Sequence, residues 1–194
     1  MDKNIKLTHP RFIDIDGDYG FDQRALKERW SAYRVDRACG VAALANLVSY
    51  GEGAFKMSGP EAIRRMDRVI AYAPPRPWGI PNAGILKRAI RHMRLPYAVE
   101  AMSGRVSGRA AYPFIARHLK ADRPVALLNT NHPERGFRYH WVTVTELIRE
   151  KGVLKVRFSS WGRRYKLDYD VLLSDKTLYR ALMALVPTTD EERK

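Results

Sequence analysis

The chain has 194 residues, of which 45% are hydrophobic and 29% charged, a composition typical of one globular domain of 1–194 that buries a core of its own. No apolar run approaches the ~18 residues of a membrane span, and Met1-Asp2-Lys3-Asn4 lacks the apolar part of a secretion signal, so we expect a cytoplasmic protein unless it is exported without such a signal. The formal charge of +14 is spread along the chain. Seven basic residues fall mostly on the polar faces of two predicted helices: Arg64, Arg65, Arg68, Lys87, Arg88, Arg91 and Arg94. Without a zinc-finger or RNA-recognition motif, this excess does not predict a specific nucleic-acid partner.

Residues 1–22 form a turn-rich arm. The run Asp14-Ile15-Asp16-Gly17-Asp18 has glycine at its fourth position rather than its sixth and no glutamate at its twelfth, so it does not match a calcium loop. We expect neither a metal nor an organic cofactor.

Residues 23–122 are predicted to form a mainly helical lobe. Ser58 and Glu61 have the spacing of a capping box, and Pro74, Pro75 and Pro77 end the helix that follows. Helical periodicity predicts helices over Phe21 to about Trp30, Cys39 to Tyr50, Ser58 to about Tyr72, a segment after Asn82 that ends before Pro96, and a segment through Phe114, Ile115, His118 and Leu119.

Residues 123–187 change to an extended pattern and are predicted to form an antiparallel sheet, followed by a polar tail over 188–194. Lys151-Gly152 supplies a hairpin turn, and a short helical turn is expected near Asp170 to Leu173. The predicted strands are Pro124 to Asn129, Trp141 to Thr145, Val153 to Phe158, Tyr165 to Leu167 and Leu178 to Val186. The fold class is therefore α+β, with helices first and sheet last.

Cys39 is the only cysteine and stands where a polar segment becomes an apolar helix. The unpaired N–H groups of a first helical turn favour a thiolate, which makes this thiol a candidate nucleophile. The alternative is that Cys39 packs as a small buried hydrophobe.

A thiol nucleophile needs a base, and histidine suits that role near neutral pH. Of the five histidines, His140 alone stands at the entrance to a predicted strand after a polar loop. The next strand ends in Ser159-Ser160-Trp161-Gly162, and hairpin pairing returns this end to the edge that carries His140. A side chain there would orient the imidazole.

These three pieces together resemble a papain-like cysteine peptidase. The interval from Cys39 to His140 is 101 residues, shorter than the about 130–150 of papain itself. The chain is therefore more similar to the bacterial branch of double-glycine leader peptidases, which process bacteriocins. Further similarity lies in Trp78-Gly79-Ile80-Pro81 and in the run Arg123 to Asn129. The resemblance implies a helical lobe with the nucleophile, packed on a C-terminal antiparallel sheet that carries the base.

The resemblance assigns Cys39 as nucleophile, His140 as base and Ser159 as the residue that orients it. Relatives have asparagine or aspartate at the position of Ser159, and Asn129 at the end of the neighbouring strand is an alternative orienter. Trp161 would shield the histidine or serve as a core aromatic.

The oxyanion hole departs from the family pattern. Relatives place glutamine six residues before the nucleophile, where this chain has Tyr33, and its only glutamine, Gln23, lies sixteen residues upstream of Cys39. Tyr33, Arg34 or Arg37 would have to replace it beside the backbone N–H of Cys39.

The function expected from this resemblance is cleavage of a peptide or amide bond through an acyl-thioester. The substrate is expected to be a peptide or protein, and the basic surface would attract an acidic one. Two alternatives stay open: an inactive or weakly active papain-like module that binds peptides, and an acyltransferase that uses the same Cys-His pair.

Overall fold

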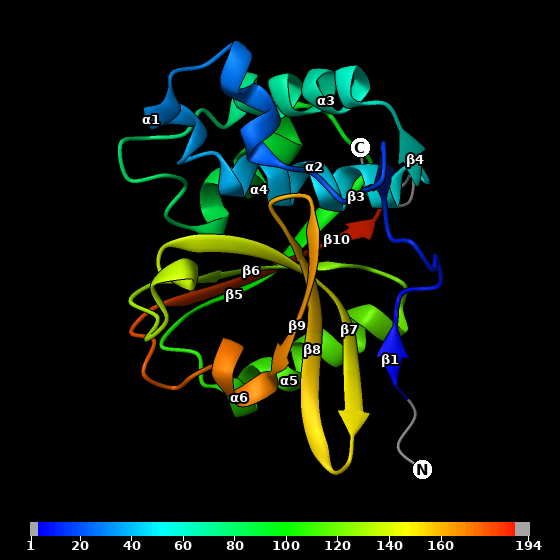
Figure 1. Cartoon of the computed structure of the whole chain (residues 1–194), viewed down its shortest axis with the longest axis vertical. Helices are drawn as coiled ribbons and strands as arrows, with labels where there is room; N and C mark the ends of the chain where they lie inside the picture. The colour runs from blue at the N-terminus through cyan, green and yellow to red at the C-terminus, as the bar shows by residue number, and fades with distance from the viewer. Residues whose placement is uncertain (1–3, 189–194) are drawn as a thin grey trace.

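The computed structural model describes residues 4–188 and shows a large sheet with helices on both faces (Figure 1). The helices are η1 Gln23–Glu28, α1 Ala32–Val35, α2 Cys39–Gly51, α3 Gly59–Tyr72, α4 Ala83–His92, α5 Gly108–Lys120, η2 Arg135–Phe137 and α6 Tyr169–Leu172. The strands are β1 Ile5–Lys6, β2 Asp14–Ile15, β3 Asp18–Tyr19, β4 Lys56–Met57, β5 Tyr97–Gly104, β6 Val125–Asn129, β7 His140–Glu150, β8 Val153–Ser160, β9 Arg163–Asp168 and β10 Arg180–Pro187.

The main sheet is antiparallel throughout and has the order β5-β10-β6-β7-β8-β9, with β1 pairing the second half of β7. Helix α2 packs on β6, β7 and β10, while α5 contacts β1, β6 and β7. Figure 1 shows α2, α3 and α4 on one side of this sheet and α5 and α6 on the other. The expected α+β class, with a large antiparallel sheet, is confirmed.

Helix α2 lies in the core, and all its residues from Cys39 to Tyr50 are buried. The small side chains at Ala42, Ala43 and Ala45 allow the helix to lie close to the sheet. One buried amide links three parts of the chain, because Asn46 accepts a hydrogen bond from the Phe21 N–H at 3.0 Å and donates one to Thr143 Oγ1 at 3.1 Å. Helix α2 is thus tied to both the arm and β7.

Most predicted elements are confirmed. Ser58 caps α3 by accepting a hydrogen bond from the Glu61 N–H, and Asn82 caps α4 in the same way. Lys151 and Gly152 have positive φ, as their hairpin turn requires. Within residues 4–188, no helix has the length and apolar character needed to cross a membrane.

Three features differ from the predictions. The helix expected from Phe21 is the short 3-10 helix η1, and Tyr97–Gly104, within the segment predicted to be mainly helical, is a strand. This strand, β5, pairs with β10 along its whole length and forms one edge of the sheet. The arm also supplies β1 to the main sheet and β2 and β3 to a small second sheet. The polar tail beyond Thr188 lies outside the described residues.

Candidate active site

Cys39 is the first residue of α2, and its side chain lies against the first residues of β7. Its Sγ is 4.0 Å from the carbonyl oxygen of Tyr139, the residue before His140. The thiol is buried, with only 5% of the residue exposed. Gly40 allows this close approach, because a Cβ there would lie 3.0 Å from Ile80 and 3.1 Å from Trp141.

The segment 73–82 covers the start of α2, and we call it the strap. The indole N–H of Trp141 donates to the carbonyl oxygen of Ile80 at 2.7 Å, which fixes the strap against β7. At its outer side the carbonyl oxygen of Pro77 accepts hydrogen bonds from the Tyr33 hydroxyl and from Nε of Arg37. Tyr33 was expected at the oxyanion hole, but its hydroxyl is engaged with the strap.

His140 begins β7 and is 8% exposed. Its Nε2 lies 2.7 Å from Ser160 Oγ, and its ring stacks on Trp161 with centroids 4.2 Å apart and planes inclined by 19°. The expectation that Trp161 covers this histidine agrees with the stacking. Two contacts therefore fix the orientation of the imidazole.

The serine beside His140 is Ser160, and the assignment of Ser159 as the orienting residue is corrected accordingly. Successive residues of a strand point to opposite faces, so only one of two adjacent serines reaches the imidazole. Ser159 instead donates to the carbonyl oxygen of Tyr19 at 2.6 Å, which ties β8 to the arm. Ser160 was visible in the sequence, but the register of the hairpin was needed to choose it.

Asn129 does not orient His140 either, although the two residues are direct partners in the β6–β7 ladder. Its amide nitrogen donates to the carbonyl oxygen of Leu172 at 2.8 Å, and its amide oxygen accepts from Nε of Arg180 at 2.8 Å. Both ends of the side chain are therefore occupied. Arg180 is itself 1% exposed and also donates to the carbonyl oxygens of Val106 and Ser174.

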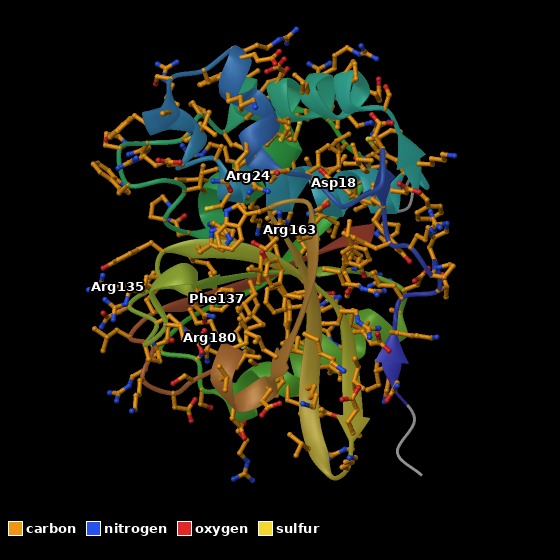
Figure 2. All side chains as sticks on the ribbon, in the orientation of Figure 1. Asp18, Arg24, Arg135, Phe137, Arg163 and Arg180 are labelled. Atoms are coloured by element: carbon orange, nitrogen blue, oxygen red, sulfur yellow. The ribbon has the colours of Figure 1, made fainter. Side chains whose placement is uncertain are left out.

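The β8–β9 turn holds Trp161 over His140 in a backbone conformation that is unusual for an aromatic residue. Trp161 and Gly162 both have positive φ, and a Cβ at Gly162 would lie 2.7 Å from a carboxylate oxygen of Asp18. Arg24 donates to the Trp161 carbonyl oxygen at 2.8 Å while its Nε binds Asp22. Figure 2 shows Arg24, Asp18 and Arg163 around this turn. Sequence reasoning missed Arg24, because it lies 137 residues from its partner.

Gln23, the only glutamine, is buried in η1 and donates to the carbonyl oxygen of Val35 at 2.9 Å. It thereby packs the start of the helical lobe against the segment that leads into Cys39. Its neighbour Arg24 reaches Trp161. Thus η1 contacts both the segment that leads into Cys39 and the turn that carries Trp161.

The electrostatics favour a neutral thiol and a neutral imidazole. Burial raises the pKa of the Cys39 thiol, and the backbone N–H groups of Trp141, Gly40 and Cys39 offset only part of that rise. Burial also lowers the pKa of His140 to about 4. The expectation of a thiolate favoured by the helix start is therefore corrected: the N–H groups act in that direction, but desolvation outweighs them.

We expect Cys39 to react slowly with iodoacetamide at pH 7, because only the thiolate is nucleophilic. The rate should keep rising up to and beyond pH 9, without the plateau near neutrality that an ion pair with His140 would give. Stopped alkylation reactions, analysed by mass spectrometry from pH 5 to pH 10, measure this profile. A plateau below pH 7 would contradict the neutral pair.

Comparison with known proteins gave no match to a family model and none to a curated protein.

Proposed function

We propose that the chain is a papain-like cysteine peptidase or amidase, with Cys39 as nucleophile and His140 as base. The observation that carries this proposal is the contact of the Cys39 thiol with the start of β7, where Ser160 and Trp161 fix the ring of His140. A histidine whose ring is fixed by a hydroxyl and an aromatic face, on a strand whose start contacts a lone thiol, supports nucleophilic catalysis.

Because the Cys39 thiol is protonated and the His140 imidazole is neutral, the thiol must lose its proton to the imidazole as it attacks. When Nε2 donates to Ser160, Nδ1 of His140 keeps a free lone pair and accepts the thiol proton as sulfur attacks the carbonyl carbon. The resulting imidazolium gives this proton to the leaving amine when the C–N bond breaks, which leaves an acyl-thioester on Cys39. Water then attacks the thioester, His140 takes a proton from it, and the acid and the free thiol are released.

Acylation with p-nitrophenyl acetate tests this proposal without knowledge of the natural substrate. We expect release of p-nitrophenol in a burst followed by steady turnover, with an acetyl group on Cys39 detected by mass spectrometry. Cys39→Ser should abolish both. If the wild-type chain acquires no acetyl group on Cys39, or acquires one that water does not remove, the proposed hydrolysis is wrong.

Ser160 and Ser159 provide a matched pair of variants. Ser160→Ala removes the partner of Nε2, and we expect it to lower acyl turnover by about tenfold, the effect of one net hydrogen bond of about 1.4 kcal/mol. Ser159→Ala removes only the contact with Tyr19 and should lower the melting temperature while leaving turnover within about twofold of wild type. Equal turnover in the two variants would contradict the role given to Ser160.

The buried, protonated thiol also favours a second function, a peptide-binding module without catalysis. This module predicts saturable peptide binding that Cys39→Ser leaves unchanged, together with no acyl turnover. An acyltransferase, by contrast, predicts that hydroxylamine or another amine accelerates loss of the acetyl group from Cys39 well beyond the rate with water. The p-nitrophenyl acetate assay therefore separates all three functions.

A further inference from the structure

Three segments surround the candidate nucleophile on one side of the molecule. The first is 31–39, which contains α1 and ends at Cys39, the second is the strap, and the third is 130–139, which contains η2 and ends at Tyr139 beside the thiol. The strap is tied to the first segment through Pro77 and to β7 through Ile80. Figure 1 shows α1, the strap and the loop before β7 on the same side. We call the outer surface of these segments the rim.

The rim exposes large aromatic side chains. Tyr33, Trp78 and Tyr139 are 52%, 62% and 67% exposed, and each segment contributes one of them. The other large exposed hydrophobic side chains among the described residues are dispersed over four elements: Tyr72 ends α3, Val153 begins β8, Val171 lies in α6 and Leu178 precedes β10. Exposed aromatics gathered around a candidate site are typical of a binding surface.

The rim is also basic. Its three segments carry two carboxylates, Asp36 and Glu134, and five arginines, which are Arg34, Arg37, Arg76, Arg135 and Arg138. Among residues 4–188, none of these arginines forms an ion pair, whereas Arg64, Arg65, Arg117 and Lys166 all do so elsewhere. Arg37 and Arg138 donate to backbone carbonyl oxygens of the rim, and guanidinium groups without an ion pair bind carboxylates through paired hydrogen bonds.

Two arginines of the first segment, Arg34 in α1 and Arg37 after it, lie over aromatic rings. The guanidinium of Arg37 lies 3.7 Å from the centre of the Tyr33 ring, and that of Arg34 lies 4.8 Å from that of Trp30. Stacking restricts the side chain and lowers the entropy lost when a ligand binds. Arg135 makes no such contact within residues 4–188, and Figure 2 shows it at the outer edge of the molecule.

We propose that the rim binds an acidic peptide segment and thereby makes peptides with glutamate or aspartate near the scissile bond the substrate class of this site. The proposal rests on the proposed function. The arginines would pair with the carboxylates, and Trp78 and Tyr139 would pack on the peptide on either side of the thiol. An ordinary solvated basic face would show the charge without the three exposed aromatics.

Binding to the Cys39→Ala variant tests the rim without turnover. The probes are short fluorescein-labelled peptides in which alanine alternates with glutamate, glutamine or lysine, and anisotropy reports their binding. We expect saturable binding of the glutamate peptide, and weaker or no binding of the other two. Arg34→Gln combined with Arg135→Gln should weaken binding of the glutamate peptide about fivefold, from two exposed pairs of about 0.5 kcal/mol each.

The control is Lys56→Gln combined with Lys120→Gln, which removes the same charge near the opposite end of α2. All four side chains are exposed, so the variants should keep the wild-type melting temperature. Equal loss of binding in the double arginine variant and the double lysine variant would overturn the proposal, because the loss would then depend only on the net charge of the protein. Tighter binding of a single-stranded oligonucleotide than of the glutamate peptide would overturn it as well.

The assays separate this proposal from the proposed function. If the Cys39→Ala variant binds the glutamate peptide through the rim and the wild-type chain shows no acyl turnover, catalysis fails and the acidic peptide is a ligand. If the wild-type chain turns over p-nitrophenyl acetate and the rim variants bind all peptides alike, the proposed preference for acidic peptides is wrong, while the proposed catalysis by Cys39 is supported.

Discussion

His140→Ala is expected to lower the rate of acyl turnover at Cys39 by a factor of about 10²–10⁴, the usual contribution of a positioned base. The loss should be large because burial keeps the thiol protonated, so it needs a base, and His140 follows the residue whose carbonyl oxygen contacts Sγ. The measurement is steady-state release of p-nitrophenol together with the acetyl content of Cys39. Both acylation and deacylation should slow, since His140 serves both steps.

His140→Gln separates chemistry from folding. Glutamine fills part of the space under Trp161 and offers an amide to Ser160, but it does not accept a proton from the thiol. We expect its melting temperature to stay closer to wild type than that of His140→Ala, while its turnover is equally low. Wild-type turnover in either variant would show that His140 is not the base.

Acid is expected to destabilise the fold between pH 6.5 and 4, and His118 should account for about 3 kcal/mol of this effect. His118 lies in α5 with a side chain that is fully buried, and burial lowers its pKa to about 4, with Arg117 acting in the same direction. Over this range the unfolded chain carries a proton on His118 that the folded chain lacks. The free energy of unfolding therefore falls as the pH falls, and below about 4 the contribution is lost.

His118→Phe is the variant that tests this source of acid sensitivity. Neither ring nitrogen of His118 has a hydrogen-bond partner among the described residues, although Nε2 lies 3.4 Å from Glu100, so phenylalanine loses little. Urea unfolding at pH 7, 5.5 and 4 should show equal or higher stability at pH 7 and a shallower decline toward pH 4. His140, with a pKa also near 4, would supply the decline that persists. An unchanged decline would assign the effect to other groups.

Local signals in the sequence were enough to predict most helices and strands. The caps at Ser58 and Asn82, the prolines after α3 and the turn at Lys151-Gly152 each act within a few residues, so their effects are visible without the fold. Strand β5 escaped prediction because it lies at the sheet edge and none of its residues is fully buried, so its sequence lacks a buried apolar run. Its partner β10 follows far along the chain, and nothing local marks the pairing.

The structure brings both proposed site residues to the start of β7, with Cys39 in contact with the residue before His140. Cys39 and His140 could be chosen from residue type and position, but the choice between Ser159 and Ser160 depends on which face of β8 each serine occupies. The contribution of Arg24 and the strap depends on long-range contacts. The raised pKa of Cys39 and the lowered pKa of His140 both result from burial, which residue type does not specify.

The site also has an order of assembly in time. Cys39 contacts a residue 100 positions later in the chain, and Arg24 contacts one 137 positions later. On a ribosome that releases the chain from its N-terminus, the thiol emerges long before the strand that carries the proposed base and the turn that holds Trp161. The edge pairing of β10 with β5 comes later still. A growing chain therefore has no complete site. The proposed hydrolase activity is expected only after the whole chain has been synthesised and folded.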